Sequence, residues 1–306
     1  MMKKLFNYLL FYCILIPLSL LPLWFLYILS SITAFLLHYI IKYRLEVVKL
    51  NVEKSFPEKS KQEQKLIINK FYKHLADVFL EGFKMLSISR KNVLKRYKCN
   101  NPEILETYFK QGQSVLLLSS HYNNWEYMVL SLGMQFPFQG IGVGKRMTNK
   151  TFEKLMHKRR TRYGTKVCYN DNVKEVFHEN EKTKTPSAYM LLSDQSPNDT
   201  YKCYWTTLLN QDTPVIFGGE YFAKKFNYPV FYYKVNKEKR GYYSFDIIPL
   251  SLTSQEEGYA EITQKYVSLL EKTIKENPPY WLWSHKRWKH KRPEKIYQDT
   301  IIKETN

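Results

Sequence analysis

A histidine and a glutamate stand five residues apart in residues 114–127, SVLLLSSHYNNWEY, and together they could do acid–base chemistry. Residues 115–118 are an apolar run of the length of a buried strand, so His121 follows a strand end. An imidazole can take a proton from a hydroxyl near neutral pH, and a carboxylate such as Glu126 can hold its ring in one tautomer. Asn123 and Asn124, between them, are candidate substrate contacts. The same pattern also suits a loop histidine that hydrogen-bonds the backbone.

Three further polar clusters follow other predicted elements. Arg146 comes after a short strand at 141–143, and Asp194-Gln195 follows an apolar strand at 188–192. Loops after parallel strands gather at one edge of a sheet, so these side chains could share a site with His121. The third cluster, residues 281–289, contains Arg287 and interleaves Trp with Lys and Arg, as segments at a membrane surface do. Ordinary solvated loop charges would also explain Arg146 and Asp194.

The elements that must position these residues alternate between strands and helices. The pattern predicts an α/β fold, a mixed sheet flanked by helices. Ser60 and Glu63 form a capping box that predicts the start of a long helix, followed by an apolar stripe of mostly core residues. Residues 43–54, before it, mix basic and apolar side chains and could lie at the membrane surface. Later strands are predicted at 140–143, 166–169, 188–192, 214–217, 229–235 and 242–248, and helices at 102–111, 127–134, 149–160, 173–179, 219–226 and 259–276.

The N-terminus predicts a membrane anchor. Residues 5–41 contain no Lys, Arg, Asp or Glu, and a single span needs about 20 apolar residues. The run is too long for a signal-peptide core and lacks a cleavage site, so we expect it to be retained. One tilted span or a re-entrant pair of shorter helices would fit, with Pro17 and Pro22 as breaks. We therefore divide the chain into an anchor, 1–42, and a second domain, 43–306, kept on the cytoplasmic side by the positive-inside rule.

Composition narrows the function classes. The net charge of +19 in 306 residues favours an anionic partner: nucleic acid, an anionic membrane or an acidic protein. Only 11 glycines are present, with no GxGxxG, GxxxxGK or GxSxG motif, which argues against nucleotide binding and serine hydrolysis. We expect no metal and no cofactor. No two of the four cysteines have a metal-ligand spacing, so we interpret them as free thiols: Cys13, Cys99, Cys168 and Cys203.

Taken in order, these motifs resemble those of the lipid A late acyltransferases (lauroyl/myristoyl type) of the lysophospholipid acyltransferase superfamily. Behind the apolar anchor, Asn51 and Phe56-Pro57 match an N-SFPE-like stretch, and His121 with Glu126 is the H-x4-D/E (HX4E) box in its glutamate version. Asp194-Gln195 matches a region after a strand. Residues 280–289, YWLWSHKRWK, resemble the C-terminal tryptophan–histidine–arginine–arginine motif. The resemblance covers about residues 43–293, although the loop after Asp194-Gln195 does not align with it.

The resemblance implies a membrane enzyme on the cytoplasmic face of a bacterial inner membrane. It would move a fatty acyl chain from acyl-carrier protein to a hydroxyl of a Kdo-bearing lipid A precursor. His121 would be the general base and Glu126 its orienting partner, with attack directly on the thioester. Arg146 is the candidate for neutralising a lipid phosphate or the developing oxyanion, Arg287 for a phosphate contact or the edge of the site. Asp194 and Gln195 are carried over as site-lining residues without a role.

Two other functions stay open at this stage. One is an acyltransferase with another lipid acceptor, an aminolipid or a lysophospholipid, since such an acceptor would need the same pair of residues. The other is a membrane-anchored polyanion-binding protein without catalysis. The basic residues are spread along an α/β pattern and no nucleic-acid motif occurs, so we do not expect nucleic acid as a partner.

Overall fold

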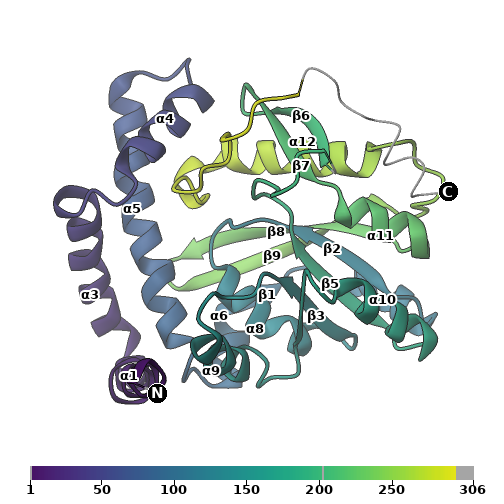
Figure 1. Ribbon diagram of the computed structural model, residues 1–306, viewed down its shortest axis with the longest axis horizontal. Helices are drawn as coiled ribbons and strands as arrows, with labels where there is room; N and C mark the ends of the chain where they lie inside the picture. Colours follow the sequence, from purple (N-terminus) through teal and green to yellow (C-terminus); the bar gives the residue numbers. More distant parts are fainter. Residues whose placement is uncertain (1, 202, 294–306) are drawn as a thin grey trace.

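The computed structural model describes residues 2–201 and 203–293, and a seven-stranded mixed sheet forms its centre (Figure 1). The strand order is β1-β9-β8-β2-β5-β3-β4. Strands β8, β2, β5, β3 and β4 run parallel to one another. Strand β9 is antiparallel to β8, and β1 pairs in parallel with β9 at the edge of the sheet. Their bounds are β1 Tyr97–Cys99, β2 Val115–Ser119, β3 Gln139–Gly144, β4 Lys166–Tyr169, β5 Ser187–Leu192, β8 Val230–Lys239 and β9 Tyr242–Ser251. The predicted α/β class is confirmed.

Strand β2 is the middle of the core. All five of its residues are buried, as expected of a parallel strand that is covered on both faces. Alternate side chains enter two separate hydrophobic clusters, Leu116 and Leu118 on one side and Val115 and Leu117 on the other. Ser119, the last residue of β2, pairs with Leu192, the last residue of β5. The two strands therefore end in register.

Helices cover both faces of the sheet. The face of Leu116 and Leu118 packs under α10 Val173–Lys182, α11 Gly218–Phe226 and α12 Glu261–Glu276. The opposite face packs against α6 Arg90–Arg96, α7 Glu103–Lys110, α8 Trp125–Gln135 and α9 Lys150–Arg160. The sequence predicted six of these helices within a few residues and missed α6 together with the short strand β1.

A hairpin stands apart from the main sheet. Strands β6 Cys203–Leu208 and β7 Gln211–Ile216 pair only with each other and lie beside α12 (Figure 1). The sequence predicted one strand at 214–217 as a member of the sheet. That placement is wrong, because β7 pairs with β6 and not with the main sheet. Strand β6 had no signal in the sequence, because polar residues interrupt its apolar ones.

The long helix α5, Lys61–Lys84, begins where the capping box predicted. Ser60 accepts a hydrogen bond from the Glu63 amide, and the Glu63 carboxylate accepts one from the Ser60 amide. Of the predicted core stripe, Leu66 and Phe79 are exposed, while most of the others are buried or half-buried. The preceding helix α4, Leu45–Ser55, buries Val48 and Val52 within the protein and leaves Leu50 exposed, so its place at a membrane surface stays a prediction.

The N-terminal apolar run forms two helical stretches rather than one. Residues Met2–Leu20 comprise α1 Met2–Leu9, the π-helical η1 Leu10–Leu15 and α2 Ile16–Leu20; residues Leu23–Ile40 comprise α3 Leu23–Phe35 and the π-helical η2 Leu36–Ile40. Each is long and apolar enough to cross a membrane. The Lys84 ammonium satisfies carbonyls at the break by donating to Ser19 and Leu21. Helices α3 and α5 run side by side, whereas α1 is seen end-on (Figure 1).

Candidate functional site

His121 and Asp194 meet because the two strands that precede them end in register. Each residue lies two positions beyond the paired ends Ser119 and Leu192. The Ser193 amide donates to the Ser119 carbonyl at 3.0 Å and continues the pairing past the strands. As a result, His121 Nδ1 lies 2.8 Å from Asp194 Oδ1. The two residue clusters that the sequence placed at one sheet edge therefore form a single histidine–carboxylate pair.

The Asp194 carboxylate is almost completely buried and fully hydrogen-bonded. Oδ2 accepts from the His121 amide and from the Trp281 indole, each at 2.9 Å, and Oδ1 faces the His121 ring. Burial acts to raise the pKa of the Asp194 carboxyl. The attraction of His121 and these hydrogen bonds outweigh that effect, and the pKa lies below its ordinary value. Asp194 is consequently ionised at neutral pH.

An ionised Asp194 determines which nitrogen of His121 carries the proton. A carboxylate can only accept hydrogen bonds, so Nδ1 of the neutral ring must be the donor and Nε2 must hold the lone pair. The Gln195 side-chain amide lies 3.2 Å from Nε2 and donates to it. The His121 side chain retains 17% exposure, against 2% for Asp194. The unprotonated nitrogen of His121 thus faces the accessible side of the site, where an acceptor hydroxyl can replace Gln195.

Glu126 does not orient His121. It lies in the first turn of α8 and accepts two hydrogen bonds from Arg160, Nε to Oε2 at 3.0 Å and Nη2 to Oε1 at 2.6 Å. Arg160 is the last residue of α9, so the pair joins two helices on one face of the sheet. The expectation that Glu126 holds the histidine ring is corrected here. The chain enters α8 between His121 and Glu126, and this turns the Glu126 carboxylate toward α9. Asp194 instead follows the neighbouring strand β5, whose end is in register with the end of β2.

The two asparagines between His121 and Glu126 are structural rather than substrate-facing. Both are fully buried. Asn123 has φ +60°, a left-handed conformation that asparagine tolerates, and its amide group donates to the Val235 carbonyl. Asn124 caps α8 by accepting from the Tyr127 amide, and it donates to Glu81 of α5 at 2.6 Å. Residues 121–124 carry the candidate base and are called the catalytic loop below; they are fixed on several sides.

The C-terminal tryptophan-rich segment forms another wall of the site. Trp281 pairs with Tyr122 through an isolated antiparallel bridge, and its indole donates to Asp194. Trp281 and Trp283 are buried, so the membrane-surface interpretation of 281–289 is wrong for both. Their aromatic rings pack on each other edge to face at 4.9 Å. The segment acts in the interior, next to the carboxylate.

The Asn51–Phe56 stretch holds this segment in place. Asn51 donates to the carbonyls of Trp283 and His285 at 2.8 and 3.0 Å, and the ring of Phe56 packs edge-on against Trp283. His285 in turn accepts from the Ser196 amide at 3.0 Å. Burial lowers the pKa of His285 to about 4, so this ring is neutral and can accept. Two sequence motifs more than 200 positions apart are thereby joined behind the His121–Asp194 pair.

The two candidate arginines lie in different surroundings. Arg287 is 1% exposed, and its Nε and Nη1 have no hydrogen-bond partner among the described residues. Burial lowers the pKa of Arg287 to about 10, and the negative charge of Asp194 is the largest effect that opposes this shift. It is a buried cation that favours the ionised Asp194, not a surface phosphate ligand. Arg146 is half exposed; it pairs with Asp171 and Glu153 and lies over the Tyr169 ring. Its charge is already balanced by two carboxylates.

An apolar cavity of about 220 Å³ adjoins the histidine. Trp125 connects the two, because its ring meets the His121 ring edge to face at 5.4 Å and also lines the cavity. The other walls come from η1, α5, α8 and α9 and are apolar except for Glu126; they include Leu15, Val78, Phe83, Phe152 and Met156. The volume lies below the roughly 300–1,000 Å³ of sites for whole drug-sized ligands, so it suits an apolar part of a ligand.

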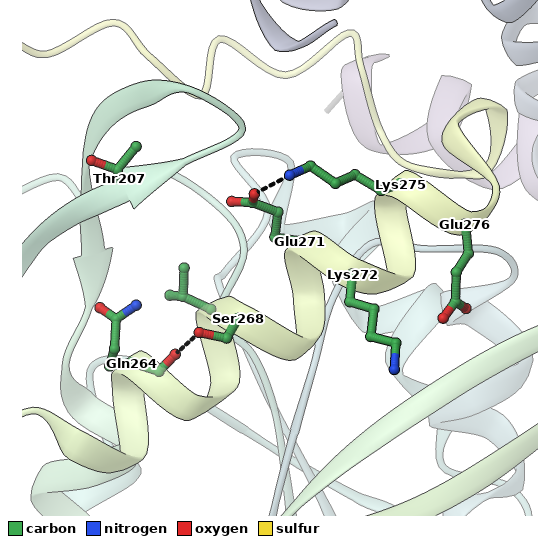
Figure 2. A pocket seen from close by; sticks show the side chains of 8 residues that line it. Thr207, Gln264, Ser268, Glu271, Lys272, Lys275 and Glu276 are labelled. Carbon is green, nitrogen blue, oxygen red and sulfur yellow. Dashed lines mark hydrogen bonds and ion pairs between the residues drawn. The ribbon is translucent and has the colours of Figure 1, made fainter.

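A larger cavity lies elsewhere and has a different character. Figure 2 shows this open groove of about 580 Å³ on α12 beside β6, lined by Thr207, Gln264, Ser268, Lys272 and other polar residues. Two of its charged side chains, Lys275 and Glu271, already pair with each other along the helix. None of the candidate site residues reaches it. We therefore assign the site to the histidine and its apolar cavity despite their smaller volume.

Sequence reasoning missed three residues that shape the site: Glu81, Arg160, and His285, whose ring accepts from the Ser196 amide. Glu81 did leave a signal, because it is a carboxylate that falls within the apolar stripe of α5. Arg160 left none, since it is one of several basic residues ending α9. Within the described ranges, 2–201 and 203–293, no three His, Cys, Asp or Glu side chains come together so that they could hold a metal ion.

The comparisons with known proteins give the family of the chain. A comparison with curated proteins found no match. A family model described as bacterial lipid A biosynthesis acyltransferase matches residues 2–290, which include both apolar helices, the His121–Asp194 pair and Arg287. This match spans nearly the whole chain and supports an enzyme that acts as an acyltransferase. The chain therefore belongs to the family of bacterial lipid A biosynthesis acyltransferases.

Proposed function

We propose that the protein transfers a fatty acyl chain from acyl-carrier protein to a hydroxyl of a lipid A precursor, with His121 as general base and Asp194 as its orienting partner. The observation that carries the proposal is the directed His121 ring. Asp194 holds Nδ1, which leaves Nε2 unprotonated on the accessible side. The ring centroids of His121 and Trp125 lie 5.4 Å apart, and Trp125 lines an apolar cavity. A base beside a cavity for a hydrocarbon chain is what acyl transfer to an alcohol requires.

The transfer step uses these groups in sequence. The acceptor hydroxyl displaces the Gln195 amide and gives its proton to His121 Nε2 while its oxygen attacks the thioester carbonyl. The tetrahedral intermediate then collapses, the carbon–sulfur bond breaks, and the imidazolium returns the proton to the departing thiolate. Asp194 stays ionised throughout and stabilises the imidazolium, the part a carboxylate has in serine-protease triads. The product is an ester, and the carrier thiol leaves free.

The apolar cavity is the proposed place of the acyl chain. Glu126 lines it at the end nearest Trp125, and the Glu126–Arg160 pair holds α9 against α8. Helix α9 contributes Phe152 and Met156 to the wall. We accordingly assign to Glu126 the task of keeping this wall in place, rather than a direct part in proton transfer.

The remaining features fit a membrane enzyme with anionic partners. We propose that residues 1–42 attach the protein to the bacterial inner membrane and that residues 43–306, of which 294–306 lie outside the described part, carry out the reaction on the cytoplasmic face. The two apolar helices are consistent with membrane association. A net charge of +19 favours an acidic carrier protein and a phosphorylated lipid alike.

An assay with purified full-length protein tests the proposal. The donor is a long-chain acyl-carrier-protein thioester, and the acceptors, in parallel reactions, are a Kdo-bearing lipid A precursor and lysophosphatidic acid. We expect ester formation on the lipid A precursor, and for His121→Ala a loss of about 10²–10⁴-fold, the usual contribution of a general base. His178→Ala is the matched control, because His178 is an exposed histidine on α10 outside the site.

Three results would revise the proposal in different ways. Acylation of lysophosphatidic acid alone would replace the acceptor while keeping the chemistry, and an added aminolipid acceptor extends the same comparison. Near-normal turnover by His121→Ala would remove His121 as the base. A protein that binds the anionic lipid but transfers nothing would favour the binding function without catalysis.

A further inference from the structure

A carboxylate that the proposed reaction does not use is buried beside the catalytic loop. Glu81 of α5 is fully buried. Its Oε1 accepts from the Tyr27 hydroxyl at 2.9 Å, and its Oε2 accepts from the Asn124 amide at 2.6 Å and the Tyr243 hydroxyl at 2.8 Å. Burial raises the pKa of this carboxyl, against hydrogen bonds that favour the charged form. Burying a carboxylate costs stability unless it is hydrogen-bonded, and Glu81 is held here by three donors.

One of these three bonds reaches the catalytic loop. Asn124 ends the loop that begins with His121 and caps α8, which carries Glu126. Its other polar group, the side-chain amide nitrogen, is held by Glu81. Asn124 is fully buried, so water cannot replace the carboxylate without a rearrangement. The position of Glu81 is therefore transmitted to the other three residues of the loop, 121–123.

Another of the bonds reaches the second apolar helix. Tyr27 lies on α3 and is packed between α5 and the β8–β9 turn. The Arg240 guanidinium lies over its ring at 4.4 Å, and a Cβ atom added at Gly241 would fall 1.9 Å from its hydroxyl oxygen. The opposite side of α3 exposes Trp24, Ile28 and Ile32. Helix α3 thus has an apolar outer face and a polar contact that runs through Glu81 to the loop.

We propose that α3 is part of the support of the catalytic loop and that Glu81 is the positioning residue that links them, through Tyr27 on one side and Asn124 on the other. This inference rests on the proposed function of His121. Its content is that the apolar helix has a second task beside attachment: it fixes the base. Displacement of a catalytic group by about 1 Å can cost up to about 10²-fold in rate, so a modest loosening of the loop is measurable.

The same helix interface offers a matched control. Ser30, one turn beyond Tyr27 on α3, donates to Asp77 of α5 at 2.6 Å in a buried bond. Asp77 is otherwise held by Arg240 and Lys237, and its hydrogen bonds do not reach residues 121–124. Ser30→Ala and Tyr27→Phe therefore each remove one hydroxyl donor between α3 and α5, but only Tyr27→Phe removes one from Glu81.

The experiment measures kcat and KM of full-length variants in lipid nanodiscs, together with their thermal unfolding. For Glu81→Ala we expect kcat to fall about 10–100-fold with KM for donor and acceptor changed less than about twofold. Glu81→Gln should recover most of that loss, because its oxygen can accept from Asn124 and Tyr243 while its amide donates to the Tyr27 oxygen. Tyr27→Phe should lower kcat by about two- to tenfold. Ser30→Ala should lower the unfolding temperature comparably and leave kcat as in the wild type.

The outcomes separate this inference from the proposed function. Full activity of His121→Ala in the same nanodiscs would defeat the proposed function on which it rests. An inactive His121→Ala together with a wild-type kcat for Glu81→Ala would overturn the link through Glu81 alone. If Glu81→Ala does not fold, Tyr27→Phe against Ser30→Ala decides: equal kcat values in the two variants would contradict the proposal.

Discussion

Two carboxylates accompany His121, one close in the sequence and one close in space. Glu126 is five residues away and pairs with Arg160, joining α8 to α9 beside the apolar cavity. Asp194 is 73 residues away and hydrogen-bonds both the ring and the backbone of His121. The difference arises from the sheet. Register between β2 and β5 brings the ends of two strands together, whereas a short turn into a helix carries the nearer carboxylate past the ring.

The two pairs also differ in their electrostatics. Asp194 is enclosed and accepts three N–H bonds, so it can hold a tautomer and stabilise a transient imidazolium without moving. Glu126 and Arg160 are partly exposed, 18% and 29%, and form a two-point ion pair. Such a pair fixes the orientation of two helices. We infer that the first pair governs the chemical step and the second governs the shape of the chain pocket.

The largest effect that separates the two pairs is expected from Asp194→Asn. The amide can present its NH2 group to Nδ1, which then has to accept, so the proton moves to Nε2 and the base loses its lone pair toward the substrate. By analogy with the equivalent substitution in serine proteases, a loss of kcat near 10⁴-fold is the scale to expect. Initial rates at saturating donor and acceptor measure it. Asp171→Asn, at an exposed carboxylate, is the control and should keep normal rates.

A smaller and different effect is expected from Glu126→Gln. The loss of one charge weakens the hold on Arg160 and loosens α9, which carries Phe152 and Met156 of the cavity wall. We expect KM to rise and the preference among acyl chains of different length to broaden, with kcat for the best donor reduced less than about tenfold. Competition between donors of 10, 12, 14 and 16 carbons measures the preference. An unchanged length profile with a large fall in kcat would speak for a direct catalytic part of Glu126.

The smallest effect concerns stability against pH. The pKa of Asp194 is lower in the folded protein than the unfolded value of about 3.9, so its stabilising contribution is fully present above that value. It is lost as the pH falls through the folded-state pKa. Asp194→Asn should therefore lower the unfolding temperature at pH 7, and the gap to the wild type should narrow below about pH 4. A gap that stays constant between pH 7 and pH 3 would show that Asp194 gains nothing from its charge.

Much of the fold could be predicted from the sequence because its signals are local. The capping box at Ser60 and Glu63, the apolar strand at 115–118 and the uncharged run at 5–41 each act within one element. Because loops after parallel strands gather at one edge of a sheet, the sequence also predicted that Asp194 lies at the same edge as His121. What could not be predicted was pairing at a distance. The sequence predicted only β7 of the β6–β7 hairpin, because polar residues interrupt the apolar ones in β6.

The site residues divide along the same line. His121 was identifiable because a polar histidine directly follows a buried strand. The exchange of Glu126 for Asp194 as its partner depends on strand register, which single-sequence patterns do not fix. Asn123 and Asn124 have the composition of ligand contacts, but their side chains satisfy Val235 and Glu81 in the interior. Trp281 is buried against Asp194, and Asn51 of α4 holds the neighbouring carbonyls of Trp283 and His285; both partners lie far away in the chain.

A double-mutant comparison in the His121→Ala background tests most directly which carboxylate works with the histidine. The residual kcat/KM of His121→Ala is measured alone, with Asp194→Asn and with Glu126→Gln. Residues that act as one unit are strongly non-additive, so Asp194→Asn should cause no further loss once His121 is gone, while Glu126→Gln should keep its full separate effect. The opposite result, in which Glu126→Gln is silent and Asp194→Asn still lowers the rate, would contradict the assignment of Asp194 to His121.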